Sequence, residues 1–61
     1  MKFRIEFDCD NAAFDDARDI EIADILVKVA GSITRDMPRS GTSYSVLDSN
    51  GNRVGYYSLN K

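Results

Sequence analysis

Apolar and charged residues alternate along the start of the chain. Charged side chains occupy the even positions from 2 to 8, and the odd positions hold Phe3, Ile5, Phe7 and Cys9. Successive side chains of a β-strand point to opposite faces, so this period of two predicts a half-buried strand over residues 1–9. The next segment, DNAAF, ends the alternation, and we expect Phe14 to fold back over one end of the core.

A helical period follows in the middle of the chain. Apolar residues recur at intervals of three and four positions, at Ile22, Leu26, Val29 and Ile33. This spacing predicts an amphipathic helix over residues 17–33, with one apolar stripe facing a sheet. We expect Asp15 or Asp16 to cap the first turn, and the segment DMPRSGTS to end the helix.

The last third of the chain predicts two strands, over residues 43–48 and 52–59, joined through SNGN. An Asn-Gly pair is typical of a two-residue type I′ turn, in which both central residues have positive φ. Such a turn sets Leu47 opposite Val54 and fixes the pairs beyond them. We expect one face, that of Leu47, Val54 and Tyr56, to meet the helix, and the opposite face to carry Tyr44, Val46, Tyr57 and Leu59.

The order strand, helix, strand, strand favours a single α+β domain over residues 1–61. Its simplest arrangement has two layers, one helix packed on a three-stranded, mainly antiparallel sheet. We expect the last strand at the centre of the sheet. A right-handed parallel crossover from the first strand to the second is the alternative.

Composition limits the chemistry of this chain. It has no histidine and one cysteine, too few donors for a zinc site, and its acidic segment lacks the spacing of a calcium loop. Cys9 lies on the inward side of its strand without a general base, so we expect a buried structural cysteine. We therefore expect no enzyme activity, no metal site and no cofactor.

The sequence also bears on location. The basic start MKFR runs into charged residues instead of an apolar stretch, and no run of about 18 apolar residues occurs. We therefore expect a cytoplasmic protein that does not associate with membranes.

The formal charge of −2 conceals a strong separation of charge along the chain. Residues 6–24 hold eight acidic residues against Arg18 alone. With Glu6, the candidate partner contacts form what we call the acidic belt: Asp8, Asp10, Asp15, Asp16, Asp19, Glu21 and Asp24. Complementary fields select partners, so this belt suits a basic groove on another protein. A solvated helix start with no partner explains the same residues.

Two other surfaces offer alternative functions. The expected outer sheet face combines aromatic and basic residues, as platforms for single-stranded nucleic acid do: Arg4, Tyr44, Val46, Arg53 and Tyr57. Nucleic acid is the less favoured partner, because the belt repels phosphates and the aromatic face is small. Alternatively, Ile20 and Val27 point away from the apolar stripe, and a homodimer through them would make the chain a self-associating structural accessory protein.

Two segments, MKFRIEFDCDNAAF and LDSNGNRVGYYSL, together resemble a group of small phage- and prophage-encoded accessory proteins. The matching positions are Asp10, Asn11, Ala12, Ala13 and Phe14, then Asp48, Asn50, Gly51, Asn52, Val54 and Gly55. Some proteins of this kind are anti-CRISPR inhibitors of type I interference complexes. The resemblance implies a non-enzymatic inhibitor in the cytoplasm of a bacterial host cell that occupies a basic DNA-binding surface on a Cas subunit. The middle of the helix and the loop TRDMPRSGTSYS lie outside the shared pattern.

Overall fold

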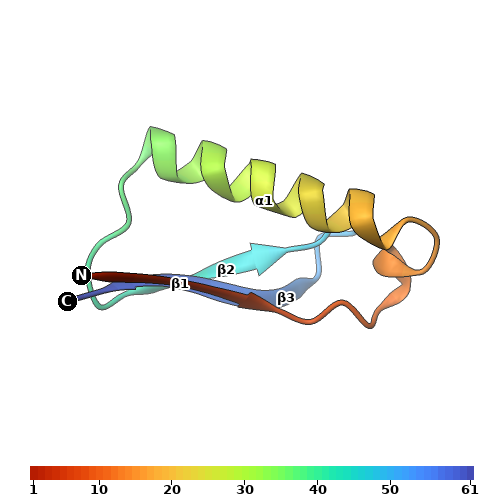
Figure 1. The fold of residues 1–61 in the computed structure, drawn as a ribbon, viewed down its shortest axis with the longest axis horizontal. Coiled ribbons are helices and arrows are strands. Elements are labelled where there is room, and N and C mark those ends of the chain that lie inside the picture. The colour runs from red at the N-terminus through yellow and green to blue at the C-terminus, as the bar shows by residue number, and fades with distance from the viewer.

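A computed structural model describes residues 1–61 and shows a helix lying across a sheet (Figure 1). The elements, in chain order, are β1 (Lys2–Phe7), the 3-10 turn η1 (Ala12–Phe14), α1 (Arg18–Arg35), β2 (Ser43–Leu47) and β3 (Arg53–Asn60). The strand order is β1-β3-β2, and β3 pairs antiparallel with both neighbours. The predicted α+β fold and central last strand are confirmed, whereas the parallel crossover is not formed.

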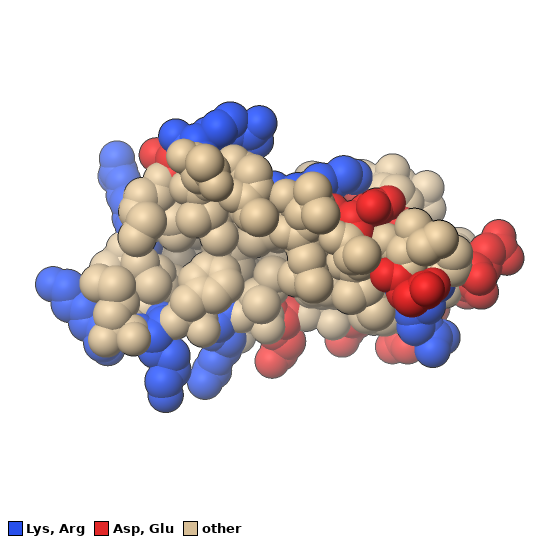
Figure 2. All heavy atoms as spheres, turned by 45° about the horizontal axis from the view of Figure 1, so that its top comes forward, with Lys and Arg blue, Asp and Glu red and all other residues tan.

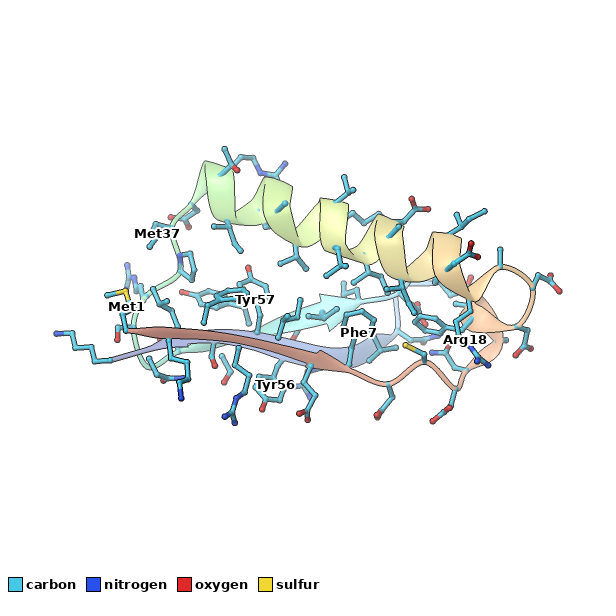
Figure 3. All side chains as sticks on the ribbon, in the orientation of Figure 1. Met1, Phe7, Arg18, Met37, Tyr56 and Tyr57 are labelled. Carbon is cyan, nitrogen blue, oxygen red and sulfur yellow. The ribbon has the colours of Figure 1, made fainter.

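The sheet turns a different face to the helix from the one predicted. Val46, Tyr57 and Leu59 are buried on the side of the sheet that carries α1, while Leu47 is exposed. Figure 3 shows Tyr57 between the two layers and Tyr56 on the far side of the sheet. The face prediction was therefore wrong.

The reason lies in the pairing of β1 with β3. Phe3 pairs with Leu59 and Ile5 with Tyr57, and residues directly opposite each other in a sheet share a face. The apolar side of β1 therefore brings Tyr57 and Leu59 to the helix. The predicted pairing of Tyr44 with Tyr57 is confirmed, so the register there was right and the choice of face was not.

The loop between β2 and β3 is also not the predicted type I′ turn. Gly51 has a φ of 82°, but no other residue of this loop has positive φ. The N–H of Gly51 donates to the carbonyl of Asp48 at 3.0 Å, and the N–H of Asp48 donates to the carbonyl of Asn52 at 2.9 Å. These bonds close a three-residue loop, and the register shifts so that Leu47 pairs with Arg53 instead of Val54.

The helix α1 runs slightly later than predicted and lacks the predicted cap. Its N-cap is Ala17, which makes no side-chain capping bond, whereas Asp15 ends η1. The buried stripe is centred on Ile25 and Val29, and Leu26 is exposed. The neighbouring turn η1 does have a cap, because the Asn11 side chain accepts a hydrogen bond from the N–H of Ala13.

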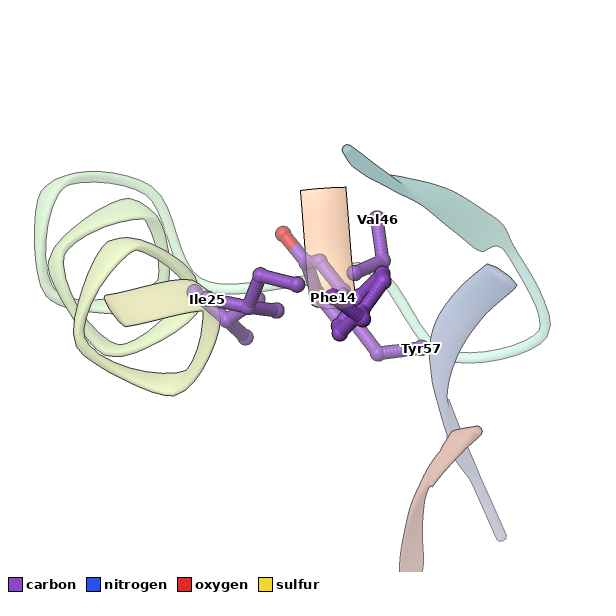
Figure 4. Packing of buried hydrophobic residues seen from close by; sticks show 5 residues of the cluster. Phe14, Ile25, Val46 and Tyr57 are labelled. Carbon is purple, nitrogen blue, oxygen red and sulfur yellow. The ribbon is translucent and has the colours of Figure 1, made fainter. Parts of the chain in front are cut away.

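A small apolar cluster joins the two layers: Phe14, Ile25, Val29, Val46 and Tyr57 (Figure 4). The prediction that Phe14 covers one end of the core is confirmed, because its side chain is 1% exposed. Cys9 is half-buried and packs against this cluster as a free thiol. The cluster is small because the chain is short, and a chain of this size hides only about 60% of the surface that it exposes when unfolded.

Gly55 lies where β3 passes close to β1. It pairs with Phe7 on one side and with Val46 on the other. A Cβ at this position would overlap the carbonyl oxygen of Glu6 and would lie 2.5 Å from the Cα of Phe7. Only glycine therefore fits the close approach of these strands.

Candidate binding surface

Exposed carboxylates gather at one end of the molecule. Figure 2 shows most acidic side chains in the right-hand half and most basic side chains at the left. The exposed members of the acidic belt are Glu6, Asp8, Asp10, Asp15, Asp16, Asp19 and Asp24. The molecule measures 37 × 19 × 17 Å, and the separation of charge runs along its longest axis. We call this acidic end, where η1 and the β2–β3 loop lie, the loop end.

One part of the belt follows the strand. Glu6 pairs with Tyr56, whose ring lies on the far side of the sheet from α1. The N–H of Asp8 donates to the carbonyl of Val54 at 3.0 Å, so the strand pairing continues past the end of β1. Alternate residues of an extended chain lie about 6.6 Å apart on one face. Glu6 and Asp8 therefore form a spaced pair of carboxylates that faces away from the helix.

The other part of the belt surrounds the beginning of α1. Asp15 and Asp16 lie between η1 and α1, and Asp19 lies in the first helical turn. Negative side chains there are stabilised by the unpaired N–H groups and the positive end of the helix dipole. Asp24 adds an exposed carboxylate further along the helix. The fold thus brings both parts of the belt to one end.

Glu21 was wrongly predicted as a surface contact. Its side chain is 8% exposed, and its Oε2 accepts a hydrogen bond of 2.8 Å from the backbone N–H of Ser49. This bond joins α1 to the β2–β3 loop. Glu21 therefore supports the structure at the loop end and is not available to a partner.

Asp48 is a residue whose role the sequence reasoning missed. It is 3% exposed, and its Oδ1 accepts hydrogen bonds of 2.9 Å from the N–H groups of Asn50 and Asn52. Its Oδ2 accepts one of 2.7 Å from the Asn11 side chain. Asp48 therefore shapes its own loop and ties it to the segment before η1. A carboxylate two residues before an Asn-Gly pair could have indicated this Asx-type loop.

The environment of Asp48 favours its charged form. Burial by itself raises the pKa of this carboxyl group, but hydrogen bonds from the backbone of Asn52, the side chain of Asn11 and the backbone of Asn50 outweigh it. The pKa of Asp48 therefore lies below its ordinary value of 3.8. The charged carboxylate of Asp48 therefore stabilises the fold through these hydrogen bonds.

The predicted aromatic platform is not present on the outer sheet face. The rings of Tyr44 and Tyr57 stack on each other with centroids 5.2 Å apart, and Tyr57 and Val46 are buried under α1. The Tyr44 hydroxyl accepts a hydrogen bond of 2.9 Å from the N–H of Arg39. Of the three tyrosines, Tyr56 alone has its ring on the far side of the sheet.

The remaining members of that predicted platform are separated from each other. Arg4 pairs with Ser58 near the end that carries the chain termini. Arg53 instead lines a hollow of about 330 Å³ near the loop end, together with Glu6, Asp8 and Tyr56. A second hollow, of about 190 Å³, lies between α1 and β2.

The structure shows no group of three or more His, Cys, Asp or Glu side chains that could hold a metal ion. None of its helices is both long and apolar enough to cross a membrane. The chain matches no protein-family model, no curated protein and no solved structure at a significant level.

Proposed function

We propose that this chain is a non-enzymatic inhibitor that binds a basic, nucleic-acid-binding surface of another protein. Its acidic belt takes the place of a phosphate backbone and blocks access to nucleic acid. The observation that carries the proposal is that seven carboxylates of the belt are exposed and that most acidic side chains lie in one half of the molecule. Glu21, which is buried, is not among the proposed contacts.

The state of these carboxylates supports the proposal. The acidic side chains that accept hydrogen bonds within the fold are those of Glu21 and Asp48. The charges of the exposed belt are therefore free to meet Arg and Lys of a partner. Arg and Lys bind carboxylates and phosphates through the same charge-assisted hydrogen bonds, so a surface built for DNA can accept the belt.

The resemblance to small phage-encoded proteins supplies the first partner to test, a Cas subunit of a type I interference complex. Such a subunit binds DNA through a basic surface, which the belt would cover. Attraction between opposite charges also raises the association rate above that of neutral surfaces. This gain in rate falls with added salt. Binding to the Cas subunit and the salt dependence of the association rate can both be measured.

A pull-down tests the proposal. Tagged protein is mixed with bacterial lysate that contains a type I interference complex, with and without nuclease, and the retained subunits are identified. A Cas subunit retained after nuclease treatment supports the proposal. Retention of nucleic acid, or loss of every protein on nuclease treatment, overturns it.

Displacement of labelled DNA from the purified complex then tests the belt itself. The triple variant Asp15→Lys, Asp16→Lys, Asp19→Lys should lose inhibition, because three attractions become repulsions. The control Asp36→Lys carries a reversed charge just after α1 and outside the belt, and it should still displace DNA. Equal inhibition by the triple variant would contradict the role of the belt.

A further inference from the structure

The outward side of α1 carries a second uncharged stripe. Its members are all exposed: Ile20, Ala23, Val27, Ala30, Gly31 and Thr34. At 3.6 residues per turn they fall within about 100° of each other around the helix, opposite Ile25. The two largest are well exposed, Ile20 at 59% and Val27 at 70%. Figure 2 turns this side of the molecule forward and shows uncharged surface between the acidic and basic ends.

A helix at the surface of a two-layer fold usually presents polar residues outward. Here the inward side, around Ile25 and Val29, is buried, and the outward side is also free of charge. The same spacing places Asp24, Lys28 and Arg35 together on one flank of the outward stripe. The outward stripe therefore has the pattern of a contact surface between helices.

We propose that this stripe is the contact surface of a homodimer, in which the α1 helices of two copies pack antiparallel about a two-fold axis near Val27. In this arrangement Val27 meets its own counterpart, Ile20 lies opposite Thr34 of the second copy, and Ala23 lies opposite Gly31. The small side chains at Ala23, Ala30 and Gly31 let the helix axes approach to about 8–10 Å. In a two-fold interface the same surface patch of each copy contacts the other. The pairs given above show that this stripe can meet its own copy in that way.

The charges select the second copy as the occupant and the antiparallel direction. The first half of α1 carries Asp19, Glu21 and Asp24 against Arg18, which leaves it acidic, and the second half carries Lys28 and Arg35. Antiparallel packing places Asp24 beside Lys28 of the second copy on the same flank. It also sets the acidic end of one molecule beside the basic end of the other (Figure 2). Parallel packing sets acidic end against acidic end, which is repulsive.

The small core supplies an energetic reason for this association. Five buried residues make up the apolar cluster, and short chains gain stability by forming oligomers. A helix of 18 residues is about 27 Å long, so the contact lies at the small end of stable interfaces. The dimer should accordingly form in the micromolar range or above, where concentration decides its population.

Asp24, which lies beside Lys28 of the second copy in the dimer, is the member of the acidic belt that both proposals use. Glu6 and Asp8 face away from α1, so their surface stays free in the pair. Loss of dimerisation through Val27 would leave these carboxylates unchanged. Loss of partner binding through Asp15 and Asp16 would leave the stripe unchanged. Failure of either proposal can thus be distinguished from failure of the other.

Sedimentation equilibrium is the first test, with protein concentrations up to about 1 mM. The wild-type mass should rise from one chain to two. Val27→Lys should weaken association at least tenfold, because it places two like charges at the axis. Leu47→Lys, at an exposed apolar residue of β2, is the matched control and should dimerise like the wild type. A wild type that stays monomeric, or a Val27→Lys variant that dimerises normally, overturns the proposal.

Exchange of charges tests the direction of the helices. Asp24→Lys and Lys28→Asp should each weaken self-association, because each variant faces like charges across the axis. An equimolar mixture of the two variants should recover association. In the mixed pair the lysine introduced at position 24 meets the aspartate introduced at position 28, and the unchanged Lys28 of the first variant meets the unchanged Asp24 of the second. A mixture no stronger than either variant alone contradicts the antiparallel arrangement.

Engineered cysteines give a readout that does not depend on affinity alone. In a Cys9→Ser background, Val27→Cys should form an intermolecular disulfide, because the two-fold axis brings the two sulfurs together. Ile20→Cys should not cross-link to itself but should cross-link to Thr34→Cys. Efficient self-cross-linking of Ile20→Cys would indicate parallel helices and overturn the proposal.

Discussion

The middle of the molecule and its loop end are held together in different ways. In the middle, Ile25 of α1 packs against Val46 and Tyr57 of the sheet through apolar contact (Figure 4). At the loop end, directional hydrogen bonds to the buried carboxylates of Asp48 and Glu21 join segments far apart in the chain. Apolar packing therefore sets the layers, whereas hydrogen bonds set the position of the loops beside the acidic belt.

Two kinds of acidic residue lie at the loop end. Asp48 and Glu21 are buried and act inside the fold, while Asp15 and Asp16 are exposed and make no such bonds. The net charge of this region does not distinguish the buried carboxylates from the exposed ones. Part of this acidity therefore positions the loops, and the rest is free for a partner.

Phe14→Ala should have the largest effect, because Phe14 lies in η1 at the loop end and yet belongs to the core. Its ring also stacks on Phe7 with centroids 6.5 Å apart. Removing a buried aromatic ring costs about 3–5 kcal/mol, and a chain of this length has only about 3–9 kcal/mol of stability. Urea unfolding followed by circular dichroism should find the variant largely unfolded.

The control for this prediction is Val27→Ala, on the exposed side of α1. Its free energy of unfolding should stay within about 0.5 kcal/mol of the wild type, measured where the chain is monomeric. A Phe14→Ala variant that loses less than about 1 kcal/mol would show that the loop end does not depend on the core.

Gly55→Ala should have the next largest effect, on the pairing of β1 with β3. The added methyl group overlaps the carbonyl oxygen of Glu6, and backbone cannot move as a flexible side chain can. Forcing extra atoms into a packed site costs about 1–3 kcal/mol and sometimes more. Thermal unfolding measures the loss, with Gly31→Ala as the control, because no atom lies within 4 Å of a Cβ there. Equal stability of both variants would contradict the close approach of the strands.

Asp48→Asn should affect the loop end and make the stability less dependent on pH. The pKa of Asp48 is lower in the folded chain than its ordinary value of 3.8. Its stabilising effect is therefore complete above about pH 5 and is lost as pH falls through the folded pKa. The variant should melt at a lower temperature than the wild type at pH 7, and the gap should narrow as pH falls towards 2.

The measurement is the melting temperature between pH 2 and 7. Asp36→Asn, at an exposed carboxyl group just after α1, is the control for removing one charge. A gap between Asp48→Asn and wild type that stays constant with pH would show that the charge of Asp48 does not support the loop.

Much of this fold could be predicted from the sequence, because the periods of two and of three to four residues are physical consequences of burying one side of each element. The alternation at Phe3, Ile5 and Phe7, and the helical stripe through Val29, led to the right layers. The face of the hairpin could not be read from its turn alone, since the pairing of β1 with β3 decides it. Tyr57 was placed on the wrong face for that reason.

The candidate site was less predictable, because the sequence shows which residues are acidic but not which carboxylates find hydrogen-bond partners inside the fold. Glu21 lies on the inward side of α1, where its carboxylate finds the N–H of Ser49, 28 positions later in the chain. No local pattern indicates such a bond. Asp48 differs, since its bonds to Asn50 and Asn52 are local, and turn chemistry could have predicted its role.

The smallest effect on stability is expected from the triple variant Asp15→Asn, Asp16→Asn, Asp19→Asn, and it tests the comparison most directly. Asp19 loses its attraction to the positive end of α1, but repulsion among neighbouring carboxylates is relieved. These opposing effects should keep the melting temperature within about 4 °C of the wild type. If the exposed belt is the binding surface, partner binding should nevertheless fall at least tenfold, and the loss should be greatest at low salt. A variant that melts far below the wild type would instead place these aspartates with Asp48, among the residues that hold the loop end together.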